Sequence, residues 1–591
     1  MYKQQEMSEA MDTRINNLKK LNDSELSLLC KDIRSFLIES ISTSGGHIGA
    51  NLAVVELTAC IHFNFNSPED KIIFDTGHQG YTHKILTGRK NIFPSLNKFK
   101  GMNRFISRDE SEHDIIDASH AGTSISIAAG YAEAMFSQKS ENYVVCVIGD
   151  GSLTEGMAFE GLNYASSNPN LKLIIIVNDN EMAIARSVGG FRKLSTGEQW
   201  QEKCKNFFNG FGYEYAAVAN GHNVESINTA LNWAKQQCKP TIIHVKTQKG
   251  FGLDCASEHP YKMHFSMPFN KDTGAGASPT VAGRTYAVAA AESMYNAVHN
   301  NKSLYVLTAA TPYASNLDAL LKDFPSQVLD VGMAEQHLVG MACGLSLGGN
   351  NVFVCAQTTF LQRAYDQINH DMCYMNLPVT ILGVRSGFAG YDGATHHGIF
   401  DISYLRSIPN LKIVYPINSE QLNKTITDRA HNPIGPMLIL YPYDEIPSPE
   451  PAVGTIYQDK YAHVASGNDL YIICLCNQLQ NAWELRSLFS EKGKSAGIIC
   501  IQSIKPFPIT EVIEELENVK YVITLEESIL AGGLGTILLE GLSEQGVSKS
   551  VYRAGINDEF IPAGNKTECC NAAGILATQV ITEVNSLWPN L

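Results

Sequence analysis

The stretch "VCVIGDGSLTEGMAFEGLNYASSNPNLKLIIIVNDNEM", residues 145–182, contains two apolar runs that each end in polar residues. Gly-Asp-Gly follows the first run, Asn-Asp-Asn ends the second, and a helix-length segment separates them. Continuous apolar runs of this kind are typical of parallel strands buried on both faces. Ligands of open parallel sheets bind beyond the carboxyl ends of the strands. We therefore expect Asp150, Gly151 and Asn180 to lie beside a ligand.

The oxygen atoms at these two strand ends suggest a metal ion. Asp150 offers a carboxylate, Asn180 an amide oxygen and Met182 a main-chain carbonyl. Mg²⁺ prefers such ligands and completes its coordination with phosphate and water, and Gly151 lets the backbone approach a phosphate. Gly-Asp-Gly alone is more often a turn with the aspartate as a helix N-cap. The second polar strand end at Asn180 favours the magnesium site.

Similar apolar runs recur along the chain with helix-length spacers between them. They are "NYVVCVIGD", "LKLIIIVND", "TIIHVKT", "SLYVLTA", "NVFVCAQ", "LPVTILGV", "LKIVYP", "MLILYP", "LYIICLC", "AGIICIQ" and "YVITLEE". This pattern predicts an α/β protein with mostly parallel sheets flanked by helices. Turn-rich segments at 270–283 and 443–455 read as linkers. We expect three domains, at 1–275, 280–445 and 455–591.

Composition narrows the class of protein. A chain of 591 residues is too long for one core, and a net charge of −15 argues against nucleic acid as a partner. The sequence shows no apolar run of membrane-spanning length and no signal peptide at its start. We therefore expect a cytoplasmic protein without a membrane partner. Most of the 14 cysteines lie in apolar runs, which predicts reduced core residues.

Further motifs run along the whole chain. They are "SGGHIGANLAVVELT", "DTGHQGYTHKILTGR", "SHAGTSIS", "GDGSLTEGMAFEGLN", "AEQHLVGMACGL", "TTFLQRAYDQINHD", "DGATHHGIFDISYLRSIPN" and "LEESILAGGLGT". Together they resemble the 1-deoxy-D-xylulose-5-phosphate synthase family of the transketolase superfamily. The resemblance implies three transketolase-like domains, of which the first takes the diphosphate and metal and the second the pyrimidine. It also implies thiamine diphosphate and Mg²⁺ as cofactors, pyruvate and glyceraldehyde 3-phosphate as substrates, and a homodimer.

Thiamine chemistry requires a carboxyl group at N1′ of the pyrimidine, so that the 4′-imino group can remove the proton at C2. The resemblance selects Glu335 for this role, and its apolar neighbours should favour the protonated form. Phe360 would stack on the pyrimidine. The other positions that match the family's cofactor site are His78, Ser119, His120, Ala121, Gly151, Ser152, Asn180 and Leu253. Leu253 stands where the family has a tyrosine.

Addition to an aldehyde needs proton delivery, and histidine suits this because its pKa lies near the working pH. The resemblance implies that His47, His264 and His396 act on the substrates. Asp392 and Arg385 match the family's polar pair beside them.

Besides Leu253, three positions depart from the family pattern, and these concern recognition of the acceptor. Tyr443 stands where the family has a phosphate-binding arginine, Gln357 where it has a tyrosine, and Asn97 where it has another arginine. The segment between "NEMAIARSVGG" and "NFFNGFGYEY" is also shorter than usual. Other cations nearby, at Lys98, Arg104 and Arg108, offer a replacement phosphate site.

Three hypotheses follow. The first is a synthase that joins the two-carbon unit of pyruvate to glyceraldehyde 3-phosphate with loss of CO₂. The second is a carboligase of the same fold with a different aldehyde acceptor. The third is a non-catalytic thiamine-binding paralogue, against which the retained Glu335, Asp150, Asn180 and histidines argue.

Overall fold

The computed structural model describes residues 2–277, 283–589 and 591. The predicted linker at 270–283 and the predicted domain start at 280 therefore fall partly outside the described residues. The chain divides into two compact units. The first comprises residues 1–280 with 332–334, and the second comprises 281–331 with 335–591. The predicted division into three domains stays a prediction.

The first unit is built on one parallel sheet of five strands in the order β1-β2-β3-β5-β4. Every residue of β3 is buried, as its "LIIIVND" sequence predicts for a central strand covered on both faces. The strands are β1 (Lys71–Phe74), β2 (Val144–Gly149), β3 (Leu173–Asp179), β4 (Glu214–Val218) and β5 (Thr241–Lys246).

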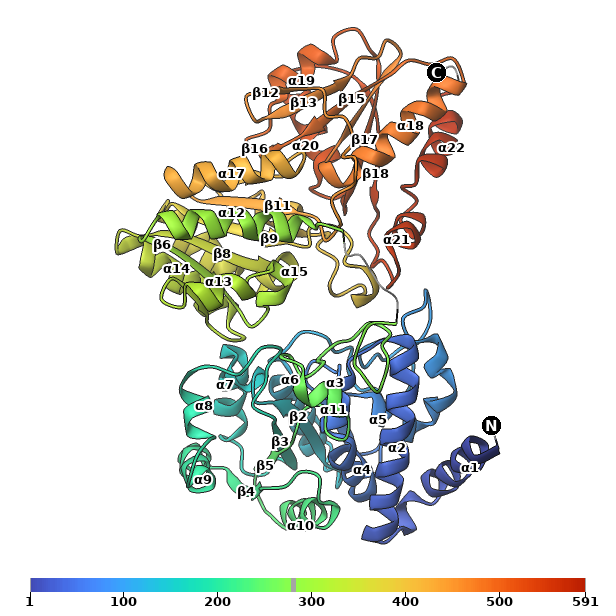
Figure 1. Cartoon of the computed structure of the whole chain (residues 1–591), viewed down its shortest axis with the longest axis vertical. Helices are drawn as coiled ribbons and strands as arrows, with labels where there is room; N and C mark the ends of the chain where they lie inside the picture. The colour runs from blue at the N-terminus through green and yellow to red at the C-terminus, as the bar shows by residue number, and fades with distance from the viewer. Residues whose placement is uncertain (1, 278–282, 590) are drawn as a thin grey trace. The chain divides into compact units, whose positions relative to one another are not determined.

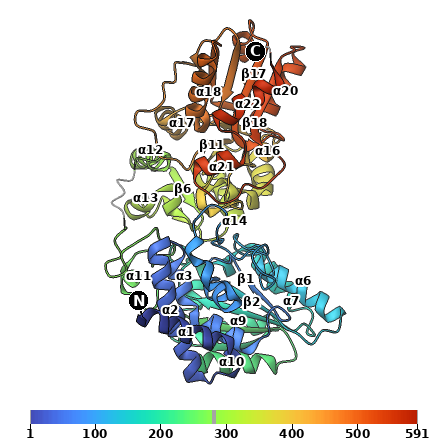
Figure 2. The same ribbon diagram turned by 90° about the vertical axis from the view of Figure 1, so that its right-hand side faces the viewer.

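Eleven α-helices surround this sheet in the described part of the first unit. Helix α2 begins with a reciprocal capping box between Asn22 and Glu25 and buries a leucine- and isoleucine-rich face. Helices α6 and α7 lie side by side (Figures 1 and 2). The helices are α1 (Tyr2–Asn16), α2 (Asp23–Ser44), α3 (Ile48–Ala53), α4 (Val55–Asn64), α5 (Tyr81–Lys84), α6 (Ser124–Ser137), α7 (Gly156–Ala165), α8 (Gly189–Leu194), α9 (Trp200–Gly210), α10 (Val224–Lys235) and α11 (Asp254–Glu258).

The second unit contains two sheets. The larger has the order β16-β10-β11-β9-β8-β6-β7 and is parallel except where β16 joins it. Its strands are β6 (Leu304–Thr308), β7 (Val328–Asp330), β8 (Asn351–Gln357), β9 (Val379–Val384), β10 (Lys412–Val414), β11 (Met437–Tyr441) and β16 (Ser503–Lys505). The smaller has the order β12-β13-β15-β14-β17-β18, and its last four strands are parallel. Its strands are β12 (Thr455–Tyr457), β13 (Tyr461–Ala465), β14 (Leu470–Cys474), β15 (Ala496–Ile501), β17 (Tyr521–Ile529) and β18 (Ser550–Ile556).

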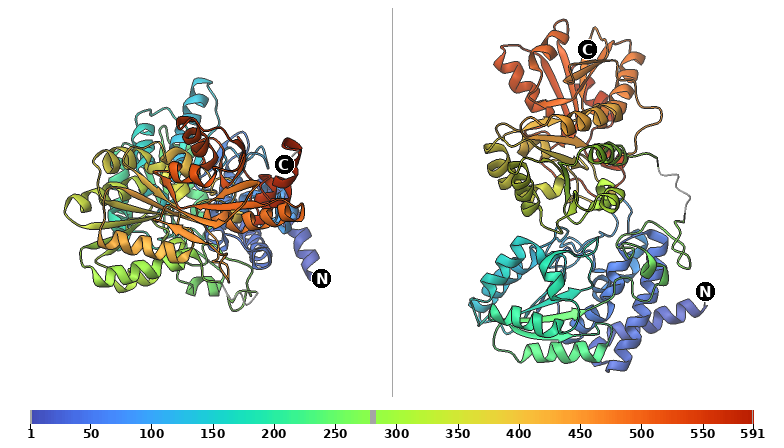
Figure 3. Two further views of the ribbon diagram at one scale, coloured as in Figure 1. Left: turned by 90° about the horizontal axis from the view of Figure 1, so that it is seen from above. Right: turned by 60° about the vertical axis from the view of Figure 1, so that its left-hand side comes forward.

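Helices cover both sheets of the second unit. Helices α12 and α17 lie side by side (Figures 1 and 3), as do α18 and α22 (Figures 1 and 2). The helices are α12 (Tyr286–Asn300), α13 (Asp318–Asp323), α14 (Glu335–Leu347), α15 (Thr358–Leu361), α16 (Asp401–Leu405), α17 (Ser419–His431), α18 (Leu479–Glu491), α19 (Ile509–Glu515), α20 (Leu534–Glu544), α21 (Lys566–Ala572) and α22 (Ala577–Leu587).

The predicted α/β class is confirmed: three mostly parallel sheets are flanked by helices. The cysteines are all free, and all are buried except the exposed Cys238 and the partly exposed Cys255. Among the described residues, no helix combines the length and apolarity needed to cross a membrane.

Candidate functional site

The structure brings Asp150 and Asn180 together at the carboxyl ends of the neighbouring strands β2 and β3. Asp150 is buried, and its carboxylate accepts hydrogen bonds from Ser187 Oγ at 2.6 Å and from the Asn180 amide at 3.4 Å. The Asn180 side-chain oxygen accepts from the Met182 amide at 3.1 Å. Burial, with the nearby Asp179 carboxylate second, raises the pKa of Asp150 to about 6. A cation bound here would offset both effects.

The candidate metal site at Asp150 and Asn180 differs from metal sites that are built from several acidic or histidine side chains. In the described part of the chain, no group of three or more His, Cys, Asp or Glu side chains is placed to hold a metal. The predicted set needs only one carboxylate, because Asn180 and Met182 would contribute an amide and a main-chain oxygen. It therefore stays a prediction.

Glycine at 151 and a buried lysine complete this edge of the sheet. A Cβ atom at Gly151 would lie 2.7 Å from Ala183 Cβ, so a larger residue does not fit. Lys249 is 4% exposed and donates to the Ala183 carbonyl at 2.6 Å. Burial lowers the pKa of Lys249 to about 7, and Asp150 opposes that shift. Sequence reasoning missed Lys249, although its position shortly after β5 was a signal.

Three of the predicted histidines form one cluster in the first unit. The ring centroids of His47 and His78 lie 5.4 Å apart, those of His47 and His264 5.5 Å, and those of His78 and His264 4.9 Å. His78 Nδ1 and His264 Nδ1 are buried without a hydrogen-bond partner in the described residues. Burial lowers the pKa of His78 to about 3 and that of His264 well below its ordinary value, with Lys249 contributing to both. These two rings are therefore neutral near pH 7.

Local backbone contacts explain how distant segments form this cluster. The Asn51 side chain, fully buried in α3, donates to the carbonyls of His47 and His78, each at 2.8 Å. Gly46 and Ser266 exchange two main-chain hydrogen bonds, which places His264 beside His47. A Cβ atom at Gly49 would lie 2.0 Å from the Lys262 carbonyl, so only glycine allows this approach. Sequence reasoning did not single out Asn51.

The loop with Ser119, His120 and Ala121 is held by an aspartate that sequence reasoning also missed. Asp75 directly follows β1, and its carboxylate accepts from the amides of Gly122 at 3.0 and 3.1 Å and of Ser124 at 3.3 Å. Ser119 and Ala121 are buried, as is Ser152. Leu253 lies in the apolar core of the first unit.

Asn97 provides an anchor for one of the three neighbouring cations. Its side-chain oxygen accepts from Arg104 Nε, and its amide donates to the Ser44 carbonyl at 2.7 Å. The Arg104 guanidinium lies 4.5 Å from the Phe265 ring centroid, and Phe265 packs 5.2 Å from His47. Lys98 and Arg108 are exposed. Arg104 is therefore the cation of the three that approaches the histidine cluster.

In the second unit, Glu335 is the first residue of α14 and is 6% exposed. Its Oε2 atom accepts no hydrogen bond from the described residues and lies 3.6 Å from an Arg363 nitrogen. Burial raises the pKa of Glu335, and Arg363 opposes that shift. The desolvated carboxyl group that the sequence predicts is present. Arg363, within "TTFLQRAYDQ", was not anticipated.

The two adjacent histidines of "GATHHG" occupy different environments. The His396 ring lies 5.6 Å from the Phe360 ring and edge-on to it. The His397 ring is almost fully buried, accepts from the Ala389 amide at 2.8 Å and lies 3.3 Å from the Pro562 carbonyl. This arrangement agrees with the choice of His396 for substrate and leaves His397 a structural role.

Arg385 lies at the end of β9 with φ = 65°, a left-handed backbone conformation that is uncommon for arginine. The side chain donates to Asp392 at 2.8 Å, so the predicted polar pair is in contact. The Tyr443 ring covers the guanidinium, with Arg385 Cζ 3.8 Å from the ring centroid. Arg385 Nε is buried and donates to no acceptor among the described residues. Gln357 is also buried, at the end of β8, and its Oε1 has no donor there.

Three family models match the chain in sequence order. They are 1-deoxy-D-xylulose-5-phosphate synthase at residues 11–206 and 193–247, the pyrimidine-binding domain of transketolase at 282–448, and the transketolase C-terminal domain at 459–580. Solved structures with similar folds include transketolases from Campylobacter jejuni and Leishmania mexicana. The Campylobacter protein is 15% identical over 96% of this chain and 100% of its own, with a TM-score of 0.45. The Leishmania protein is 17% identical over 96% of this chain and 97% of its own, with a TM-score of 0.46.

Curated relatives match nearly the full length. A protein named 1-deoxy-D-xylulose-5-phosphate synthase from Listeria monocytogenes is 37% identical over 96% of this chain and 95% of its own. One of the same name from Alkaliphilus oremlandii is 35% identical over 98% of each chain. The chain thus belongs to the 1-deoxy-D-xylulose-5-phosphate synthase family, which consists of thiamine diphosphate-dependent transferases of the transketolase type.

Proposed function

We propose that this protein decarboxylates pyruvate and joins the remaining two-carbon unit to glyceraldehyde 3-phosphate, forming 1-deoxy-D-xylulose 5-phosphate. Family membership supports this reaction. The observation that carries it is the buried Glu335 carboxyl group, whose Oε2 accepts no hydrogen bond in the described residues. A buried carboxyl oxygen that accepts no hydrogen bond costs stability unless a ligand uses it.

The residues of the second unit fit the pyrimidine of thiamine diphosphate. Glu335 Oε2 would face N1′, and the raised pKa of its carboxyl group favours the proton that such a contact shares. Phe360 would offer an aromatic face to the ring. When bound, thiamine diphosphate supplies a carbon nucleophile for the keto group of pyruvate and accepts the electron pair left when CO₂ departs.

The residues of the first unit fit the diphosphate and a metal ion. Asp150, Asn180 and the Met182 carbonyl would hold Mg²⁺. Burial and the neighbouring Asp179 raise the pKa of Asp150, and a bound cation would favour its ionised form. Gly151 has no side chain, so its backbone can approach a phosphate. Lys249 is buried at the same edge, and a bound diphosphate would favour its charged form.

The remaining site residues would handle protons and anionic substrate groups. His78 and His264 are neutral, so each ring presents one donor nitrogen and one acceptor nitrogen. Together with His47 they would move a proton to or from the substrate oxygen atoms. Arg385, whose Nε donates to no acceptor among the described residues, would bind a substrate carboxylate or phosphate.

By analogy with the family, we also propose that the protein is a homodimer. Analytical ultracentrifugation, which measures the mass of the protein in solution, tests this.

A second candidate function keeps the same donor chemistry but takes a different aldehyde. It is favoured by Tyr443, which covers the guanidinium of Arg385 where the family supplies a second arginine. Arg104, held by Asn97, is the cation that favours retention of a phosphate site instead.

Purified protein incubated with pyruvate, Mg²⁺, thiamine diphosphate and a panel of aldehydes separates these candidates. We expect glyceraldehyde 3-phosphate to give the highest kcat/KM. A higher value for an unphosphorylated aldehyde would replace the first candidate by the second. Absence of product with every aldehyde would favour a non-catalytic paralogue.

A further inference from the structure

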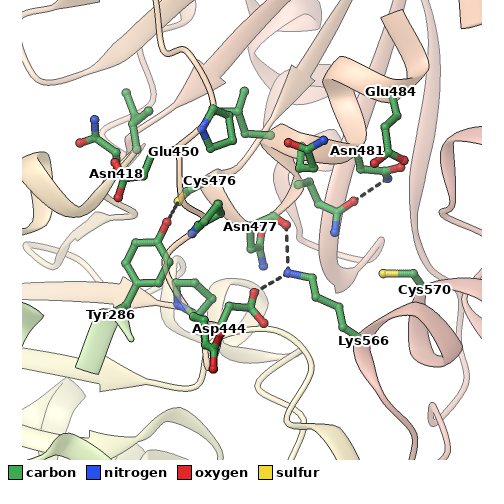
Figure 4. A pocket seen from close by; sticks show the side chains of 18 of the residues that line it. Tyr286, Asn418, Asp444, Glu450, Cys476, Asn477, Asn481, Glu484, Lys566 and Cys570 are labelled. Carbon is green, nitrogen blue, oxygen red and sulfur yellow. Dashed lines mark hydrogen bonds and ion pairs between the residues drawn. The ribbon is translucent and has the colours of Figure 1, made fainter. Parts of the chain in front are cut away.

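A cavity of about 410 Å³ lies within the second unit (Figure 4). Three segments form most of its lining, and Glu335 is not part of it. These segments are 442–451, 476–484 and 566–576, and Tyr286 and 417–418 complete the lining. Lys566, the first residue of α21, extends into this region. No role for Lys566 follows from the proposed function.

The Lys566 ammonium group lies among three oxygen atoms. It contacts Asp444 Oδ2, lies 3.1 Å from Glu527 Oε1 and donates to the Asn477 carbonyl at 3.2 Å (Figure 4 shows the contacts with Asp444 and Asn477). An ammonium group has three donors, so these contacts use all of them. We call Lys566, Asp444 and Glu527 the Lys566 cluster.

Each carboxylate of the Lys566 cluster is connected to one member of the Arg385–Tyr443 pair through a nearby segment of the chain. Asp444 directly follows Tyr443 in the chain. Glu527 is almost fully buried, and its Oε2 accepts from the Phe388 amide at 3.1 Å, three residues after Arg385. One ammonium group therefore anchors both segments that carry the stacked pair.

The charge balance of the cluster depends on Lys566. Burial alone would lower the pKa of Lys566, but Glu527 and Asp444 raise it above the ordinary value, so the side chain stays charged. Without that charge, two neighbouring carboxylates would face each other, one of them buried. Breaking a buried ion pair in this way leaves an uncompensated charge. The surrounding segments must then move so that water reaches the carboxylate, or the carboxylate must take up a proton.

We propose that Lys566 is a positioning residue, which holds Tyr443 against Arg385 and thereby sets the affinity for the acceptor substrate. This inference rests on the proposed function, because that function assigns Arg385 to substrate binding. It adds a dependence on the C-terminal segment of the chain, which supplies both Lys566 and Glu527.

Kinetics of three variants test this role. In Lys566→Met we expect the acceptor KM to rise about tenfold, with kcat changed less than about threefold and the pyruvate KM unchanged. Lys566→Arg should retain the wild-type acceptor KM. Lys424→Ala is the matched control, because Lys424 also bridges two carboxylates in the second unit but on the exposed surface, and it should leave all constants unchanged.

The cavity makes a rescue experiment possible. Lys566→Ala removes the ammonium group beside a space that small molecules can enter. Propylammonium should restore the acceptor KM of this variant, whereas propanol, which has the same size but no charge, should not. The acceptor KM of the Lys566→Met/Asp444→Asn double variant should be no higher than that of the more impaired single variant, because both changes break the same ion pair.

A measurement that needs no turnover separates this inference from the proposed function. We expect hydrogen exchange at the Phe388 amide to accelerate in Lys566→Met and to stay unchanged in Lys424→Ala. If the wild-type protein converts no aldehyde but this acceleration is seen, the proposed function fails and the anchoring by Lys566 stands. Unchanged exchange and unchanged acceptor KM would overturn the inference. An equal loss in acceptor KM, pyruvate KM and kcat would also overturn it, since Lys566 would then support only the general structure.

Discussion

Glu335 is the residue whose environment links most directly to catalysis. Because its carboxyl group is buried and its pKa raised, we expect Glu335→Gln to lower turnover by roughly 10²- to 10⁴-fold, the range for loss of a proton relay. Thiamine diphosphate affinity should change only a few-fold. Proton exchange at C2 of the bound cofactor, followed by NMR, measures the step itself. Glu540→Gln, on the surface of the same unit, is the control. Exchange at the wild-type rate in Glu335→Gln would contradict the assignment.

Asp150 is the residue on which the proposed metal site depends. We expect Asp150→Ala to lose most of its affinity for thiamine diphosphate, since the diphosphate then lacks the cation that neutralises it. Calorimetry with Mg²⁺ present measures this, and Asp109→Ala, an exposed aspartate of the same unit, should bind normally. Equal affinities in the two variants would remove Asp150 from the metal site.

Tyr443 is the residue on which the proposed recognition of the acceptor phosphate depends most. Asp392 partly neutralises the charge of Arg385. A phosphate dianion bound at Arg385 could therefore accept hydrogen bonds from a second guanidinium group. We expect Tyr443→Arg to lower the KM for glyceraldehyde 3-phosphate about tenfold or more with little change in kcat, because a remote contact forms equally in ground and transition states.

Tyr443→Phe keeps the stacked ring and should leave that KM unchanged. A low micromolar wild-type KM that Tyr443→Arg does not improve would show that other cations, Arg104 foremost, have rebuilt the phosphate site.

At the scale of single residues, sequence patterns predicted those parts of the site that follow from local motif chemistry. The residues His47, His78 and His264 lie together, as do Arg385 and Asp392, whereas the roles assigned to them stay predictions. Lys249 and Arg363 were missed because their importance comes from burial and from partners far away in sequence. The only local signal for Lys249 was its position shortly after β5, and Arg363 had none.

At the scale of elements, helix α16 begins at a buried acid. Burial raises the pKa of Asp401 to about 7, whereas an unfolded aspartate titrates near 4. Between these values the folded protein keeps a proton that the unfolded chain has released. Stability from this group is therefore complete below about pH 4 and falls as pH rises towards 7.

We expect Asp401→Asn to remove this contribution, which is at most about 1.4 kcal/mol per pH unit. Urea denaturation between pH 5 and 8 measures it: the wild-type protein should lose stability with rising pH more steeply than the variant. Asp428→Asn, exposed on α17, should follow the wild-type curve. Parallel curves for the wild-type protein and Asp401→Asn would contradict the raised pKa.

The apolar runs identified in the sequence all form strands, because β-branched residues in central strands are buried on both faces. Among the described residues, sequence reasoning missed seven strands, which have different features. Strands β7, β12 and β16 have three residues each, β1, β4 and β18 lie at sheet edges, and β13 is partly exposed. A long apolar run therefore does not mark them in the sequence.

At the scale of the whole molecule, cofactor binding should stabilise the protein. A ligand that binds only the native state at about 100 times its Kd adds about 2.7 kcal/mol. We expect thiamine diphosphate with Mg²⁺ to raise the melting temperature, and EDTA to cancel most of the rise. Asp150→Ala should show no rise. An equal rise with EDTA present would contradict a metal-dependent site.

The sequence could not indicate how the predicted linker at 443–455 is used. Turn-forming residues indicated a linker there, but Asp444 within it contacts Lys566. Elsewhere in the unit, β16 joins the same sheet as β10 and β11. These contacts join residues far apart in the chain, and local sequence patterns do not encode them.

The most direct test of the account follows the carbon atoms of pyruvate. Protein with thiamine diphosphate, Mg²⁺ and glyceraldehyde 3-phosphate receives pyruvate labelled with carbon-13 at C2, and the products are identified by NMR and mass. The account predicts release of the unlabelled carboxyl carbon as CO₂ and label at C2 of 1-deoxy-D-xylulose 5-phosphate, with neither product in Glu335→Gln above its residual rate. Cofactor binding without CO₂ release from any pyruvate and aldehyde mixture would contradict it.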